Sequence, residues 1–166
     1  DDPTPTRIRN KQLMKQVNIA ILGCGTVGTG VARLLLENGD IIRDRIGCIL
    51  NLKYVADIDT VKDRGLTFQP GVMIPDAATA IADPSVDIVV ETIGGEGIAK
   101  QLLLEAIDNG KHVVTANKAL LAKHGNAIIA AATEKGVDLA FEASVGGCMP
   151  IIKTVENLWW EIGSAP

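Results

Sequence analysis

Three glycines near the start of the chain have the spacing of a phosphate-binding turn. Gly23, Gly25 and Gly28 fit the pattern G-x-G-x-x-G within the stretch VNIAILGCGTVGTG. In this pattern the first glycine permits a tight turn, the second lets a pyrophosphate approach the backbone, and the third lets a helix pack against the strand. Free N–H groups and the helix dipole favour an anion there. The pattern predicts a dinucleotide site, although glycines also occur in turns that bind no ligand.

The residues around the turn have the pattern that such a site needs. An apolar strand is expected over residues 17–22, and an apolar helix from about Thr26 to Asn38, with Gly39 as its C-cap. Residues 40–47 have the pattern of an amphipathic extension or a loop.

Strands and helices continue to alternate along the chain. Strands are expected over residues 51–56, 72–74, 86–92, 111–116 and 137–142. Between them lie a short helix that Asp76 caps and Pro84 ends, a helix over 96–109, and a helix over 117–135 that Gly125 could interrupt. The alternation predicts an α/β fold of the Rossmann type, a doubly wound, mostly parallel sheet with helices on both faces. Ligands bind such sheets beyond the carboxyl ends of the strands.

Asp57 follows the second predicted strand. In a dinucleotide fold an acidic residue at this place accepts hydrogen bonds from the adenosine ribose, and its charge repels a 2′-phosphate. Lys62 and Arg64 follow closely and could instead hold a 2′-phosphate. The sequence favours NAD only slightly over NADP, and a solvated turn aspartate is the remaining interpretation of Asp57.

Two later loops at strand ends also carry polar groups. Thr92, in ETIGG, could face the nicotinamide ribose, or Glu91 could simply cap the next helix. Lys118, in TANK, begins a predicted helix, where a cation opposes the helix dipole at a cost of about 0.3–1 kcal/mol. A residue that costs stability where it lies is a candidate for a site, although most lysines are solvated surface residues.

Residues 142–150, EASVGGCMP, follow the last predicted strand. The paired glycines allow backbone carbonyls to turn outward, and a carboxylate beside such carbonyls suits a group 1 or group 2 cation. A glycine hinge into the next helix explains the pattern equally well.

The composition argues against several classes of protein. The net charge of −4 gives no general attraction for nucleic acid or an anionic membrane. No apolar run approaches the ~18 residues that span a bilayer. Three cysteines without a C-x-x-C pair argue against a disulfide framework or a zinc site, and for a reducing cytoplasm. Residues 1–15 are polar and are expected to be a disordered leader.

Taken together, these loops resemble the cofactor-binding domain of homoserine dehydrogenase. The matching pieces are ILGCGTVGTGV, DIVVETIGG, VVTANKALLAKHG and FEASVGGCMPII, in that order. The family oxidises homoserine to aspartate semialdehyde, or catalyses the reverse reduction, with NAD or NADP, in threonine, methionine and isoleucine biosynthesis. The resemblance implies an oxidoreductase that acts on this small-molecule substrate. It also implies that the full-length enzyme is a homodimer.

The resemblance also implies roles for particular residues. Thr26 and Val27 contact the cofactor diphosphate through their backbone, and Thr92 lies at the nicotinamide side. Lys118 matches the lysine that touches cofactor and substrate, and it is the expected catalytic residue. Family members hold a sodium or similar ion in the EASVGG loop, at positions that match Glu142, Val145, Gly147 and Met149. Cys148 departs from the family's usual glycine, which puts that loop's backbone path in question.

The last residues depart from the family as well. ENLWWEIGSAP, which starts at Glu156, does not resemble the family's continuation into a substrate domain. We expect residues 16–150 to form the NAD(P)-binding domain and residues 151–166 to begin a linker to a missing substrate domain. Such a fragment binds cofactor with little turnover. Two alternatives stay open: a non-catalytic dinucleotide-binding regulatory module, and another semialdehyde-linked dehydrogenase with Cys148 as nucleophile.

Overall fold

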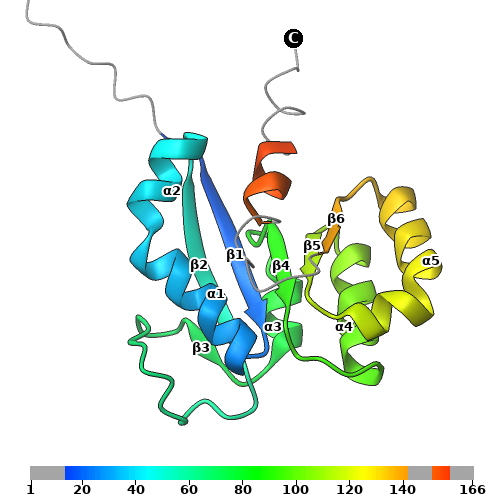
Figure 1. Ribbon diagram of the computed structural model, residues 1–166, viewed down its shortest axis with the longest axis horizontal. Helices are drawn as coiled ribbons and strands as arrows, with labels where there is room; N and C mark the ends of the chain where they lie inside the picture. The colour runs from blue at the N-terminus through cyan, green and yellow to red at the C-terminus, as the bar shows by residue number, and fades with distance from the viewer. Residues whose placement is uncertain (1–13, 142–150, 158–166) are drawn as a thin grey trace, which may run out of the picture.

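The computed structural model, which describes residues 14–141 and 151–157, is built on one six-stranded parallel sheet (Figure 1). Its strands are β1 (Gln16–Leu22), β2 (Ile49–Ala56), β3 (Met73–Ile74), β4 (Ile88–Glu91), β5 (His112–Thr115) and β6 (Leu139–Phe141). They lie in the order β3-β2-β1-β4-β5-β6, and every neighbouring pair is parallel. This order confirms the predicted doubly wound fold.

The strand order reverses its direction at β1. The chain leaves β1 toward β2 on one side and later returns to place β4 on the other side. Ligands of doubly wound sheets bind in the crevice beyond the carboxyl ends of the strands at such a switch. The turn after β1 begins at Gly23 and the loop after β4 begins at Thr92, so these two segments flank the switch.

Helices cover both faces of the sheet (Figure 1). One face packs against α1 (Thr26–Glu37), α2 (Gly39–Ile46) and the helical residues 151–157. The other face packs against α3 (Ala77–Ala82), α4 (Gly97–Asp108) and α5 (Lys118–Lys135). Successive side chains of a strand point to opposite faces. Accordingly Ile19 and Ile21 belong to the first core, and Ala20 and Leu22 to the second.

The structure corrects one predicted helix end and removes one predicted interruption. Gly39 is not the C-cap of α1: Asn38 takes that place, its N–H donates to the Leu34 carbonyl, and Gly39 begins α2. The reason is that Gly39–Ile46 form a helix of their own, which buries Ile42 against the sheet. α5 runs unbroken over 18 residues, through Gly125.

The predicted cap of α3 is confirmed. The Asp76 carboxylate accepts hydrogen bonds from the backbone N–H groups of Ala78 and Thr79, at 3.1 and 3.2 Å. These are two of the N–H groups that a helix start leaves without partners in its own backbone.

Candidate functional site

The glycine turn after β1 is built as the spacing predicts. Gly23 has a φ of +90°, a conformation that a side chain would strain. A Cβ on Gly28 would lie 2.0 Å from the Gly23 carbonyl oxygen and 2.7 Å from the Thr92 hydroxyl oxygen. A Cβ on Gly25 would meet no atom of the described residues within 4 Å. Gly23 and Gly28 therefore shape the turn, whereas Gly25 borders open space.

The first turn of α1 presents backbone donors to that open space. Gly25 is the N-cap and offers no side-chain acceptor, and no acidic residue lies in the first turn. The first intrahelical bond runs from the Thr29 N–H to the Gly25 carbonyl, at 2.9 Å. No residue within the described ranges accepts from the N–H groups of Thr26, Val27 or Gly28. Such donors, together with the positive end of the helix dipole, attract an anion.

Asp57 lies at the end of β2, directly beside the glycine turn. Its carboxylate accepts hydrogen bonds from the backbone N–H groups of Cys24, at 2.7 Å, and Asp59, at 2.9 Å. Burial alone would raise the pKa of Asp57. The bonds from Asp59 and Cys24, with the nearby Arg64 guanidinium, outweigh burial and hold that pKa below its usual value. Asp57 is therefore not a solvated turn residue, since its side chain is only 18% exposed.

Arg64 holds the segment after β2 against the glycine turn. Its guanidinium donates to the carbonyl oxygens of Cys24 at 2.8 Å, Lys62 at 3.0 Å and Asp59 at 2.6 Å. It also lies 3.3 Å from an Asp57 oxygen, and its side chain is only 4% exposed. Of the two cations that could hold a 2′-phosphate, Arg64 is already engaged, whereas Lys62 is exposed.

Thr92 connects the loop after β4 to the glycine turn. Its hydroxyl is directed at the carbonyl oxygens of Gly23, at 2.7 Å, and Leu22, at 3.1 Å. A Cβ on Gly23 would lie 3.0 Å from the backbone of Ile93. The two loops at the switch are thus in direct contact, and the Thr92 hydroxyl helps to fix their separation.

Glu91 does not cap the next helix, contrary to one of the two interpretations of its loop. Its carboxylate is fully buried and accepts from the N–H groups of Ile93 and Gly94, at 2.8 and 3.1 Å. The N-cap of α4 is Glu96, which makes no side-chain capping bond. Glu91 is the buried last residue of β4, and its carboxylate binds N–H groups of the loop that follows rather than those at the start of α4.

Lys118 is the first residue of α5 and is exposed, at the carboxyl end of β5. The side chain of the preceding residue, Asn117, accepts from the Leu120 N–H at 3.0 Å and so caps the helix. The Lys118 ammonium forms no ion pair with any described residue. Its predicted place at a helix start is confirmed, and its contact with cofactor and substrate stays a prediction.

Sequence reasoning missed the roles of Arg64 and Asn117. A signal existed for Asn117, because asparagine directly before a helix is a common N-cap. No signal existed for the bond from Arg64 to Cys24, which joins residues 40 positions apart. The predicted sodium ligands Glu142, Val145, Gly147 and Met149 lie outside the described residues, as does Cys148. Cys24 and Cys48 are free and buried, as expected of small core residues.

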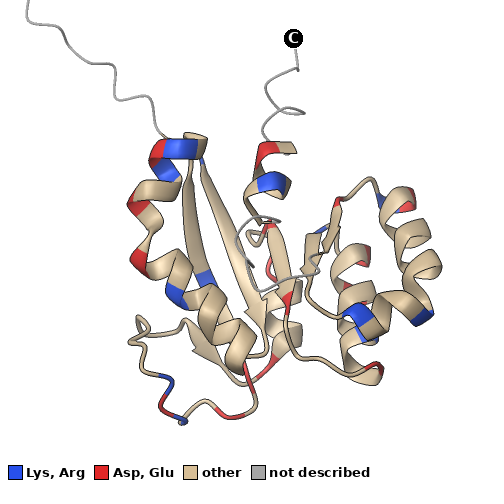
Figure 2. Cartoon of the chain, viewed as in Figure 1, with Lys and Arg blue, Asp and Glu red and all other residues tan. Residues whose placement is uncertain are grey.

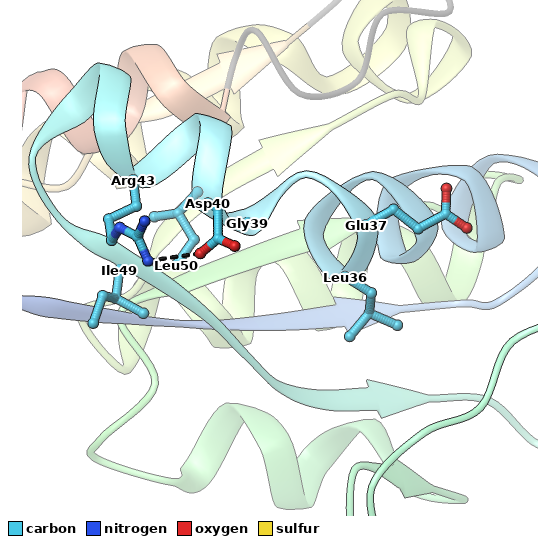
Figure 3. Close-up of a pocket in the computed structure, with 7 residues that line it drawn as sticks. All are labelled: Leu36, Glu37, Gly39, Asp40, Arg43, Ile49 and Leu50. Carbon is cyan, nitrogen blue, oxygen red and sulfur yellow. Dashed lines mark hydrogen bonds and ion pairs between the residues drawn. The ribbon is translucent and has the colours of Figure 1, made fainter.

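A hollow of about 220 Å³ lies away from the glycine turn (Figure 3). It is lined by Leu36, Glu37, Gly39, Asp40, Arg43, Ile49 and Leu50. These residues belong to the end of α1, to α2 and to the start of β2, which is the amino end of the sheet. Because dinucleotides bind at the carboxyl ends of the strands, this hollow is not part of the candidate site.

Charged residues of both signs are interspersed along α2 and along the segment between β2 and β3 (Figure 2).

Among the helices that the structure describes, none has both the length and the apolar character to cross a bilayer. Within the same residues, no three His, Cys, Asp or Glu side chains are grouped as metal ligands.

The chain is similar to known homoserine dehydrogenases over most of its length. Residues 23–142 match the family model described as homoserine dehydrogenase, NAD-binding domain. The Bacillus subtilis homoserine dehydrogenase is 41% identical over 144 residues, which are 87% of this chain and 33% of that protein. The Corynebacterium glutamicum enzyme is 46% identical over 82% of this chain and 30% of its own length.

Solved structures agree with these matches. The homoserine dehydrogenase of Thiobacillus denitrificans superposes with a TM-score of 0.73 and 44% identity, over 86% of this chain and 33% of that one. The Staphylococcus aureus enzyme at pH 7.0 superposes with a TM-score of 0.73 and 41% identity, over 78% of this chain and 33% of that one. The chain spans about one third of the length of the relatives that it matches. It therefore belongs to the homoserine dehydrogenase family, and the matched residues form the NAD-binding domain of that family.

Proposed function

We propose that this chain binds NAD(P) at the glycine turn and acts in the oxidation of homoserine to aspartate semialdehyde, or in the reverse reduction. The observation that supports the binding site is that, within the described part of the chain, the N–H groups of Thr26, Val27 and Gly28 have no acceptor and a Cβ on Gly25 would meet no atom within 4 Å. A dinucleotide diphosphate fits these donors in charge and in hydrogen bonding. The reaction is that of the relatives, which are homoserine dehydrogenases.

The chain's own residues have separate tasks in this proposal. The bound nicotinamide supplies the hydride acceptor for the alcohol carbon. Lys118, at the carboxyl end of β5, directs its ammonium to the alcohol oxygen and polarises it. Homoserine then transfers a hydride from its alcohol carbon to the nicotinamide and its hydroxyl proton to a general base, which we assign to the part of the relatives outside this match, and becomes aspartate semialdehyde. Substrate and cofactor must be held in a near-attack geometry. We assign substrate binding to the part of the relatives that these residues do not match.

We propose NAD as the preferred cofactor. The Asp57 carboxylate lies beside the turn, where the ribose of the adenosine is expected, and its charge repels a 2′-phosphate. Arg64, which could have neutralised that phosphate, is held by three carbonyl groups and by Asp57. Lys62 is the exposed cation left in this segment. NADH should therefore bind more tightly than NADPH.

The direct test is titration of the 166-residue chain with NADH and with NADPH, followed by nicotinamide fluorescence. We expect saturable binding with NADH favoured. Absence of binding at millimolar NADH would overturn the proposed site, and tighter binding of NADPH would overturn the preference. In an assay with homoserine and NAD, we expect little or no turnover by these residues alone. Turnover typical of a dehydrogenase, about 1–10³ per second, would overturn the assignment of substrate binding to other segments.

Three finer points rest on the resemblance and composition alone. They are a sodium ion at Glu142, Val145, Gly147 and Met149, a homodimeric full-length enzyme, and a cytoplasmic location. A regulatory, non-catalytic role is the competing function. It predicts that Lys118→Ala leaves dinucleotide affinity and any partner binding unchanged, whereas our proposal, in which Lys118 contacts cofactor and substrate, predicts weaker NADH binding.

A further inference from the structure

Two loops at the carboxyl end of the sheet share a buried carboxylate. Glu91, with no exposed surface, accepts from the N–H groups of Ile93 and Gly94 in the loop after β4. Its second oxygen accepts from the Thr115 hydroxyl at 2.5 Å, at the end of β5. Three donors thus converge on one carboxylate, which fits the acceptor-only character of the ionised form. Hydrogen bonds to a charged group inside a protein are about twice as strong as neutral ones.

The same hydrogen bonds close into a ring through Asn117. The Asn117 N–H donates to the Thr115 hydroxyl oxygen at 3.0 Å. Its side-chain amide donates to the Gly95 carbonyl at 2.5 Å, back in the loop after β4. Its side-chain oxygen caps α5 through the Leu120 N–H. Thr115 and Asn117 are buried, so water does not compete for these bonds.

We infer that Glu91 is a positioning residue, which locks the loop after β4 to the start of α5 and so fixes the nicotinamide end of the cofactor relative to Lys118. The inference rests on the proposed function. Lys118 directly follows Asn117, and the loop after β4 contacts the glycine turn through Thr92. The ring therefore joins the segment that carries the ammonium to the segment that faces the switch between β1 and β4.

The ring also decides what the loop after β4 offers a ligand. The N–H groups of Ile93 and Gly94 point inward to Glu91 and are not available to an anion. Ile93 and Gly94 are left to contact a ligand through their carbonyl oxygens and side chains. Carbonyl oxygens suit a ligand group with hydroxyl donors, such as the nicotinamide ribose, better than a phosphate.

The test separates the two ends of the dinucleotide. NADH reaches both the turn and the loops, whereas ADP lacks the nicotinamide ring and the ribose that carries it. We expect Glu91→Gln to weaken NADH binding about tenfold, as for loss of a hydrogen bond to a charged group, and to change ADP binding less than about twofold. Thr115→Val should weaken NADH binding to a similar extent. Thr115→Ser keeps the hydroxyl and should bind NADH as the wild type does. Glu134→Gln, on the exposed face of α5, is the matched control.

A measurement without ligand keeps the inference testable by itself. Because the ring is closed, Thr115→Val should accelerate hydrogen exchange at the Ile93 and Gly94 amides, which donate to Glu91 and not to Thr115. Unchanged exchange there would overturn the coupling, as would equal weakening of NADH and ADP binding by Glu91→Gln. If Glu91→Gln does not fold, the comparison of Thr115→Val with Thr115→Ser tests the inference instead. If the wild-type chain binds neither ligand, the proposed function fails, and hydrogen exchange still decides whether the loops are locked.

Discussion

The two ends of the sheet differ in whether their polar groups are paired within the protein. Near the amino ends of β4 and β5, the Asp83 carboxylate accepts from Lys53, Tyr54 and Ser85. The Lys111 ammonium nearby donates to the carbonyls of Asp83 and Val86, at 2.6 and 2.9 Å. At the carboxyl end, the N–H groups at the start of α1 have no acceptor among the residues that the structure describes. The first arrangement holds the fold together, and the second is available to a ligand.

The largest effect should come from Gly28, which belongs to both the fold and the site. In Gly28→Ala the new Cβ would lie 2.0 Å from the Gly23 carbonyl oxygen, so α1 must shift away from the turn. We expect a loss of about 3 kcal/mol in the free energy of unfolding, measured by urea denaturation. Gly30→Ala, in the same helix and with open space around it, is the control and should gain about 0.5–1 kcal/mol. Equal stabilities of the two variants would contradict this account.

A change at the amino end should lower stability without changing binding. Lys111 is 4% exposed, and burial lowers the pKa of its ammonium. Lys111→Met removes the donor and leaves the carbonyls of Asp83 and Val86 without it. We expect a loss of about 2 kcal/mol in unfolding free energy, with NADH affinity unchanged. A parallel loss of NADH affinity would show that the two ends of the sheet are not separate.

Gly25→Ala should weaken NADH binding and leave stability nearly unchanged. Its backbone, with φ of −77° and ψ of −154°, accepts a side chain, and a Cβ there meets no described atom within 4 Å. The free energy of unfolding should change by less than about 1 kcal/mol. The methyl group would stand where the diphosphate approaches, so NADH binding should weaken about tenfold or more, equivalent to about 1.4 kcal/mol. Fluorescence titration checks this, and unchanged affinity would place the diphosphate elsewhere.

The smallest effect is the acid dependence that Asp57 contributes. Its pKa in the folded chain lies below the ordinary value of 3.8, because the bonds from Asp59, Cys24 and Arg64 outweigh burial. A carboxyl with a depressed folded pKa contributes stability above its unfolded pKa, and this contribution is lost as the pH falls through the folded pKa. Asp57→Asn should therefore lose less stability than the wild type between about pH 5 and pH 2. Identical acid profiles would contradict the shift.

Local patterns predicted much of this molecule, and contacts between distant segments escaped prediction. The glycine spacing and the Asp76 cap concern residues within a few positions of each other, where chain geometry dictates the contact. The bond from Thr115 to Glu91 spans 24 positions and exists only because β4 and β5 are paired in register. The sequence pattern identifies Glu91 as polar at a strand end. Only the fold shows that it faces inward.

Arg64 has a consequence for how this chain can be altered. The arginine and Asp57 fasten both ends of residues 58–63 to the glycine turn and to each other. Within this segment, Ile58 is 96% exposed and Val61 is 92% exposed. These two residues can therefore be exchanged for others while Asp57, Asp59 and Arg64 hold the segment beside the turn. Redesign of what borders the adenosine end of the site can begin there, with the core left untouched.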